Sequence, residues 1–98
     1  MERYTVAPET LQDLQDIWDF IARDNPETAD HLQEEFFGAF GGLAAMPGKG
    51  HTREDLTDLP VRFFPLHSYL IVYRSDPAPL QIVAVLHGAR DIPTVLKR

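Results

Sequence analysis

The chain of 98 residues contains no cysteine, which excludes a disulfide framework and any thiolate that could serve as a nucleophile or a metal ligand. It also lacks a long apolar run, because no stretch approaches the about 20 residues that a membrane-spanning helix needs. The first residues do not combine a basic segment with an apolar one, as a secretory signal would. We therefore expect a cytoplasmic protein that has no membrane partner.

Basic residues are scarce in the first half of the chain. Residues 1–46 carry ten acidic residues against two basic ones, a net charge of −8, whereas residues 47–98 carry five acidic residues against seven basic ones, a net charge of +2. The overall charge of −6 and the isoelectric point near 5.0 oppose binding to a phosphate backbone, which normally requires a basic face. We expect the two halves to face different partners, and a protein target rather than direct binding of nucleic acid.

The four histidines show no spacing that suits a metal site. They stand at positions 31, 51, 67 and 87, with no pair three or four residues apart and no adjoining array of carboxylates. Zinc sites usually draw their ligands from such closely spaced groups. We expect no metal and no other cofactor.

Hydrophobic periodicity predicts a strand followed by two helices. Residues 3–6 are β-branched and aromatic, as a short strand requires. In residues 9–24 the apolar side chains recur at helical spacing with acids between them, which predicts an amphipathic helix with an acidic outer face. Asn25 is a good cap and Pro26 a good first residue for a second helix, which should end at Pro47.

Three apolar runs follow, at residues 61–66, 69–74 and 80–87, and predict a β-meander. Side chains alternate between the two faces along a strand. In the last run, the even-numbered residues from Leu80 to Leu86 should therefore share one face, and the odd-numbered residues the other.

The order of these elements predicts an α+β fold. Two helices joined by a residue or two form an antiparallel hairpin. We expect one domain over residues 1–98, in the order β-α-α-β-β-β, with an antiparallel sheet packed on one face by the N-terminal helical hairpin. Gly38, Gly41 and Gly42 lie in the second helix, where each costs about 1 kcal/mol relative to Ala. They either weaken the helix end or let another element come close, and the sequence leaves both open.

Three segments carry short motifs in a particular order. The first is the proline, glycine and arginine pattern of residues 44–56, which follows the second predicted helix. The second is the hairpin of residues 61–74, and the third is the ending His-Gly-Ala-Arg-Asp within residues 85–91. With these motifs and this element order, nearly the whole chain resembles the ParE branch of the RelE/ParE toxin superfamily.

The resemblance implies the toxin of a type II toxin–antitoxin system. It further implies neutralisation by a small ParD-like antitoxin and, for the free toxin, inhibition of DNA gyrase and so of replication. The RelE branch of the superfamily instead cleaves messenger RNA on the ribosome, which is the alternative function. A binding module without toxicity is a third possibility. The acidity of this chain is a departure from the superfamily, many of whose toxins are basic, and it argues further against an RNA substrate.

A ribonuclease of the RelE type would need an acid, a base and cations around the phosphate. In this chain His87 would supply the acid or base, and Arg62 and Arg90 the cations. No second His or Glu lies within a few residues of His87 to pair with it. We therefore interpret His87 as a structural residue whose ring holds the turn at Gly88, and we expect no catalytic residue.

Two groups of residues are predicted to bind other proteins. We expect the antitoxin to pack as a helix in a groove or as an added strand at the sheet edge, since the apolar surface exceeds what a small domain covers unaided. The predicted antitoxin contacts are Trp18, Phe36, Phe40 and Arg74. The predicted contacts with the target are basic residues near the C-terminus, namely Arg90, Lys97 and Arg98. The acidic row on the first helix, at Asp13, Asp16 and Asp19, is either a solvated face or a surface for basic antitoxin residues.

Overall fold

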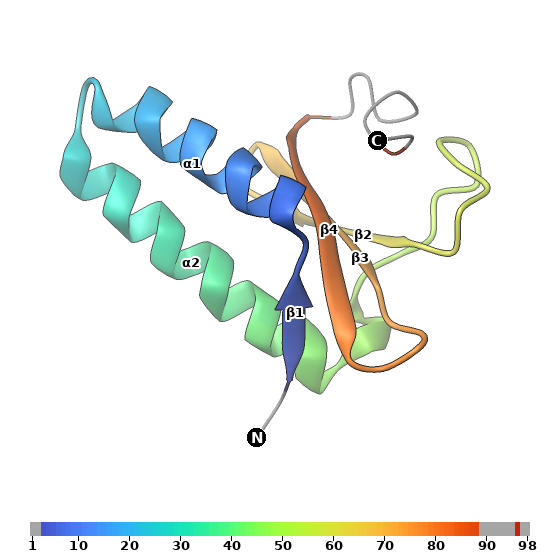
Figure 1. Cartoon of the computed structure of the whole chain (residues 1–98). Helices are drawn as coiled ribbons and strands as arrows, with labels where there is room; N and C mark the ends of the chain where they lie inside the picture. Colours follow the sequence, from blue (N-terminus) through green and yellow to red (C-terminus); the bar gives the residue numbers. More distant parts are fainter. Residues whose placement is uncertain (1–2, 89–95, 97–98) are drawn as a thin grey trace.

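The computed structural model describes residues 3–88 and Leu96, and in this part of the chain the predicted order of elements is confirmed (Figure 1). Each predicted boundary lies within two residues of the observed one. The elements are β1 (Tyr4–Val6), α1 (Pro8–Ala22), α2 (Pro26–Ala45), the short 3-10 turn η1 (Pro47–Lys49), β2 (Arg62–Leu66), β3 (Tyr69–Arg74) and β4 (Leu80–His87). Within the described residues, neither helix is long and apolar enough to cross a membrane.

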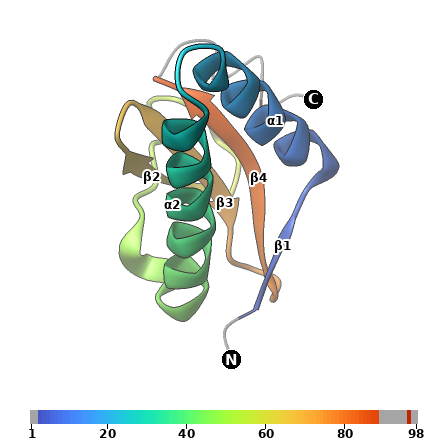
Figure 2. The same ribbon diagram turned by 90° about the vertical axis from the view of Figure 1, so that its left-hand side faces the viewer.

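The two helices form the predicted antiparallel hairpin and lie together on one side of the sheet, as Figure 2 shows. The cap predicted from the sequence is present, since the backbone N–H of Thr28 donates to Oδ1 of Asn25 over 3.1 Å. Pro26 occupies the first turn of α2, where a missing N–H costs nothing. The chain therefore reverses sharply after α1, which brings both apolar helix faces onto the sheet.

The sheet has the strand order β1-β4-β3-β2 and is mixed rather than wholly antiparallel. Strands β2, β3 and β4 pair antiparallel, as predicted, but β1 pairs parallel with β4. The parallel pairing of β1 with β4 follows from the path of the chain between them. The chain leaves β1 through both helices and the β2–β3 hairpin before β4 returns beside β1 in the same direction.

A β-bulge in β4 changes which side chains face the helices. Val72 pairs with Ala84 but Tyr73 pairs with Ile82, so Val83 is an extra residue in β4. Up to Ile82 the even-numbered side chains pack under the helices, as predicted. Beyond the bulge the prediction is wrong, because Val85 joins the helix-side core while Ala84 and Leu86 lie in a second core.

The helix-side core and the second core cover the two faces of the sheet. The helix-side core holds ten buried residues, among them Leu14, Phe36, Phe40, Ile71 and Tyr73. The second core holds five, which are Val61, Phe63, Val72, Ala84 and Leu86. Leu56, from the loop before β2, and Leu96 pack against this second core. Both faces of the central strands are thus removed from water.

The three glycines of α2 do not make room for another described element. A Cβ atom built on Gly38 or Gly41 would meet nothing within 4 Å, and at Gly42 the nearest atom is Nζ of Lys49 at 3.9 Å. Gly50, by contrast, is closely packed. A Cβ atom there would lie 2.5 Å from the hydroxyl oxygen of Tyr73 and 2.9 Å from the carbonyl oxygen of Phe63. The position after η1 therefore requires glycine.

Candidate functional site

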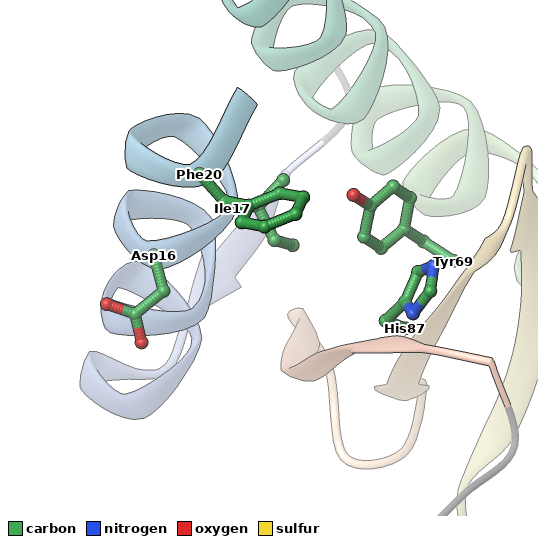
Figure 3. A pocket seen from close by; sticks show the side chains of 5 residues that line it. All are labelled: Asp16, Ile17, Phe20, Tyr69 and His87. Atoms are coloured by element: carbon green, nitrogen blue, oxygen red, sulfur yellow. The ribbon is translucent and has the colours of Figure 1, made fainter. Parts of the chain in front are cut away.

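A pocket of about 270 Å³ opens between the second half of α1 and the neighbouring ends of β3 and β4 (Figure 3). Its lining consists of Asp16, Ile17, Phe20, Tyr69 and His87. Pockets for small molecules usually measure about 300–1,000 Å³. This one lies just below that range, and its size suits one or two side chains of a protein partner.

The strand wall of the pocket depends on the register of β3 and β4. Tyr69 and His87 are cross-strand partners, and their ring centroids lie 5.2 Å apart. The Tyr69 ring also packs edge-on against Phe36 of α2, at 5.6 Å between centroids. Burial raises the pKa of the Tyr69 phenol above its ordinary value, so the hydroxyl stays neutral at physiological pH. This wall therefore consists of two aromatic rings, those of Tyr69 and His87.

The helix wall of the pocket exposes a large apolar side chain. Phe20 is 68% exposed, the largest exposure among the bulky apolar side chains of the described residues. Ile17, one turn earlier on α1, is half-buried and packs against the helix-side core. Phe20 therefore adds an exposed aromatic ring to the apolar lining of the pocket.

The acidic row of α1 divides into two parts. Asp13 is structural, because its Oδ2 accepts a hydrogen bond from the backbone N–H of Val85 over 3.1 Å. Asp16 and Asp19 are exposed, and each accepts a hydrogen bond from the glutamine four residues earlier, at 2.8 and 2.9 Å. Residues 8–22 contain no basic side chain. Beside the pocket, α1 thus presents carboxylates that a cationic partner residue can neutralise.

Two residues of the ribonuclease hypothesis, His87 and Arg62, are described by the structure, and they lie far apart. Arg62 pairs with Tyr73, whereas His87 pairs with Tyr69, four residues away along β3. At about 3.3 Å per residue this separates them by roughly 13 Å along the sheet, in addition to the width of two strand spacings. Nη1 of Arg62 donates to the carbonyl of Gly50 over 3.0 Å. Arg90 lies outside the described residues.

The prediction that the His87 ring holds the turn at Gly88 is wrong. The turn is held instead by the backbone, where the N–H of Gly88 donates to the carbonyl of Ser68 over 2.8 Å. The His87 side chain is exposed and contacts Tyr69 at the mouth of the pocket. His87 is therefore a surface residue that lines the pocket.

The predicted antitoxin contacts have different positions in the structure. Phe36 and Phe40 are 1% and 0% exposed, so they belong to the core and have no surface to offer a partner, which corrects the prediction. Trp18 is half-buried and its Nε1 donates to Oδ1 of Asp30 over 2.9 Å, joining α1 to α2. Arg74 is half-buried at the end of β3, with its Nε atom enclosed and without a hydrogen-bond partner. The structure brings none of the four to the pocket.

The predicted target contacts Arg90, Lys97 and Arg98 lie outside the described residues, so the structure does not place them. Phe20 was missed by the sequence analysis, although a signal was present. At 100° per residue, Phe20 shares a helix stripe with Asp13 and Asp16, so the spacing places its aromatic ring on the acidic outer face of the helix. Among the described residues, no group of three or more His, Asp or Glu side chains could hold a metal ion.

Two comparisons with known proteins give matches. The family model described as "ParE toxin of type II toxin-antitoxin system, parDE" matches residues 4–92. A solved structure described as "Chromosomal ParDE TA system from P. aeruginosa" is similar with a TM-score of 0.72 and 20% sequence identity, and the match covers 90% of this chain and 97% of that chain. At this identity the likeness shows the fold alone. No curated protein sequence matches the chain.

Proposed function

Because the chain belongs to the family of ParE toxins of type II toxin–antitoxin systems, we propose that a ParD-type antitoxin neutralises it and that the free toxin inhibits DNA gyrase in the cytoplasm. The chain would act as one domain over residues 1–98. Inhibition would proceed by binding, without catalysis by the toxin. Replication would stop because gyrase no longer relieves the strain ahead of the fork.

One observation carries the antitoxin part of this proposal, namely the pocket beside Phe20. It combines an exposed aromatic ring, an apolar hollow sized for side chains and the carboxylate of Asp16, with that of Asp19 nearby on the same helix. An antitoxin segment with an apolar anchor and basic flanks would complement all three. Aromatic anchors in pockets with surrounding polar contacts dominate the affinity of many protein interfaces.

The choice of gyrase over messenger RNA is supported by charge and by geometry. The net charge of −6 opposes an RNA substrate, and the His87 and Arg62 side chains stand on strands that are not neighbours, at positions far apart along the sheet. We assign the target contact to Arg90, Lys97 and Arg98 of the basic half, as the resemblance and the charge division suggest. Antitoxin binding would span both halves, as the lining of the pocket does.

The test is to incubate the purified protein with gyrase and plasmid DNA, and separately with translating ribosomes. Accumulation of cleaved gyrase–DNA complexes or loss of supercoiling is the expected result. Messenger RNA cut only in the presence of ribosomes would instead establish the RelE-type activity. The small protein encoded in the neighbouring reading frame should reverse the effect on gyrase, and failure to do so would contradict the antitoxin assignment.

A further inference from the structure

The pocket between α1 and the strands is lined mostly by aromatic rings. Phe20 lies on the helix side, and Tyr69 and His87 lie on the strand side. In Figure 3 the Phe20 ring points from α1 across the hollow toward the ring of Tyr69. Ile17 adds an aliphatic side chain to this lining, and Asp16 adds a carboxylate. The pocket therefore combines three rings with one acid.

Such a lining favours a positively charged group. The faces of the phenyl and phenol rings carry partial negative charge, and a cation within about 6 Å of a ring centroid is attracted to them. Aromatic cages that bind quaternary ammonium groups use the same attraction. An aliphatic occupant would gain nothing from these ring faces beyond its buried area, and it would lie beside the Asp16 carboxylate without neutralising it.

Asp16 places a full negative charge next to the rings. It precedes Phe20 by four residues in α1, so the two side chains are neighbours on the helix surface. Its Oδ1 atom accepts a hydrogen bond from the neutral amide of Gln12 over 2.8 Å. The two ion pairs that join described residues both lie elsewhere. A cation that stacks on the Phe20 ring can therefore reach a carboxylate that has no cationic partner in this part of the chain.

Arginine suits this lining better than lysine does. Its guanidinium is planar, so it stacks on an aromatic ring while its N–H groups bond to a carboxylate, and it is less strongly hydrated than an ammonium group. Its methylene stem is apolar and can pack along Ile17 while the charged end stays near Asp16. A single arginine side chain thus meets the apolar and the basic requirement of the site together.

We propose that the pocket binds one arginine side chain of the ParD-type antitoxin, with the guanidinium stacked between Phe20 and Tyr69 and paired with Asp16. This inference rests on the proposed function and specifies the antitoxin residue that fills the pocket. A second copy of the chain is a poorer occupant. Each copy carries a net charge of −6, and residues 8–22 have no basic side chain to offer.

The experiment measures the affinity of the purified chain for the small protein encoded beside it, by isothermal titration calorimetry. Each arginine of the small protein is replaced in turn by methionine, which keeps an unbranched apolar side chain but carries no charge. At one position this change should raise the dissociation constant at least about tenfold. Unchanged or tighter binding after every such replacement would show that no arginine fills the pocket, and would overturn the proposal.

Asp16→Asn tests whether that arginine binds in the pocket. Asp16 is exposed, so the fold should be kept, and the dissociation constant for the unchanged small protein should rise about fivefold or more. In the Asp16→Asn chain, the decisive arginine-to-methionine change should cost less than about threefold, because two changes that remove one shared contact are not additive. A full tenfold loss there would place the arginine elsewhere and refute the assignment.

Asp19→Asn is the matched control for the charge. Asp19 is also exposed on α1 and also accepts a hydrogen bond from the glutamine four residues earlier, but it does not line the pocket. Its substitution should change the dissociation constant by less than about twofold, as for a surface charge without a direct partner. Equal effects of Asp16→Asn and Asp19→Asn would contradict a direct pair with Asp16.

Phe20→Leu tests the stacking on the ring. Leucine keeps an apolar side chain at this exposed position but has no π-electron face. The dissociation constant should rise about three- to tenfold, as expected for a cation–π contact at a partly exposed site. Phe37→Leu is the control, because Phe37 is 42% exposed on α2 and does not line the pocket. An unchanged affinity for Phe20→Leu, or an equal loss for Phe37→Leu, would count against the stacking.

The outcomes separate this inference from the proposed function. If the small protein does not bind the chain at all, the antitoxin assignment fails and the arginine contact fails with it. If the small protein binds and neutralises the chain, but neither its arginines nor Asp16 and Phe20 affect the affinity, the proposed function survives and the arginine contact is wrong.

Discussion

The hydroxyl group of Tyr73 provides a direct test of the hydrogen bonds that stabilise the fold. Tyr73 is 0% exposed, and its Oη donates to the carbonyl of Pro47 over 2.6 Å and accepts from the N–H of Gly50 over 2.9 Å. The two bonds fasten the segment between α2 and β2 to the central strand. Tyr73→Phe keeps the ring and removes both bonds.

The expected loss of stability follows from the two backbone groups, the N–H of Gly50 and the carbonyl of Pro47, that lose their hydrogen-bond partner. A buried group that loses its partner costs about 1–3 kcal/mol, and here Gly50 is buried while the carbonyl of Pro47 keeps some access to water. We expect a loss of about 2–3 kcal/mol in the free energy of unfolding. For a domain near this size, each kcal/mol lowers the melting temperature by about 4–8 °C, so the shift should be about 10–20 °C.

The measurement is urea denaturation of the parent and Tyr73→Phe chains, followed by circular dichroism and by the fluorescence of Trp18. The slope of the transition should not change, because the same surface is exposed on unfolding. The matched control is Tyr4→Phe, since Tyr4 is half-buried at the sheet edge and packs its ring on Phe40. A Tyr73→Phe chain within about 0.5 kcal/mol of the parent would refute the reasoning.

The same residue predicts a pH dependence. Burial, as the largest cause, raises the pKa of Tyr73 above the ordinary value of 10.0. The folded state then holds its phenolic proton more tightly than the unfolded state does. The stabilisation is fully present below pH 10 and is lost as the pH rises through the higher folded-state pKa. The parent chain should therefore lose more stability above pH 10 than Tyr73→Phe, as chemical denaturation at pH 8 to 11 would measure.

Three further predictions concern the site. Asp13→Ala should destabilise the fold by about 1–2 kcal/mol, because the Val85 N–H loses its acceptor, and denaturation with Asp19→Ala as control checks this. His87→Gln should change the stability by less than about 0.5 kcal/mol, because the ring is exposed; a clearly lower melting temperature would contradict this. Arg90→Glu, or removal of the last two residues, should reduce toxicity in cells more than antitoxin binding in a pull-down assay, and equal losses would count against the division.

Local patterns predicted the helices and strands because each pattern depends on neighbours in the sequence. The Asn25-Pro26 pair marks the start of α2, since capping needs only the first turn of the helix. The direction of β1 could not be predicted, because parallel pairing with β4 depends on where a segment more than 70 residues later comes to lie. Local spacing contains no information about such a contact.

Local spacing also could not predict which aromatic residues are buried in the core and which are exposed to a partner. Phe36 and Phe40 have the positions of core residues in α2, yet an apolar residue at a helical spacing can equally contact a partner. Whether such a residue is buried or contacts a partner depends on the strands beneath the helix. Phe20 is exposed because α1 diverges from the sheet toward its C-terminal end, and that divergence follows from the tertiary packing.

The bulge at Val83 connects the two features that the sequence analysis missed, the face reversal and the pocket. Val83 and Ala84 are both apolar, so the extra residue leaves no break in the hydrophobic run that would reveal it. Without it, His87 would lie on the far face, away from α1, and the strand wall of the pocket would keep only Tyr69. The bulge also turns the Val85 N–H toward Asp13, which fastens α1 to β4 beside the opening. Bulges commonly re-aim side chains next to functional sites, and here one extra residue determines both which side chain of β4 lines the pocket and where α1 is bonded to β4.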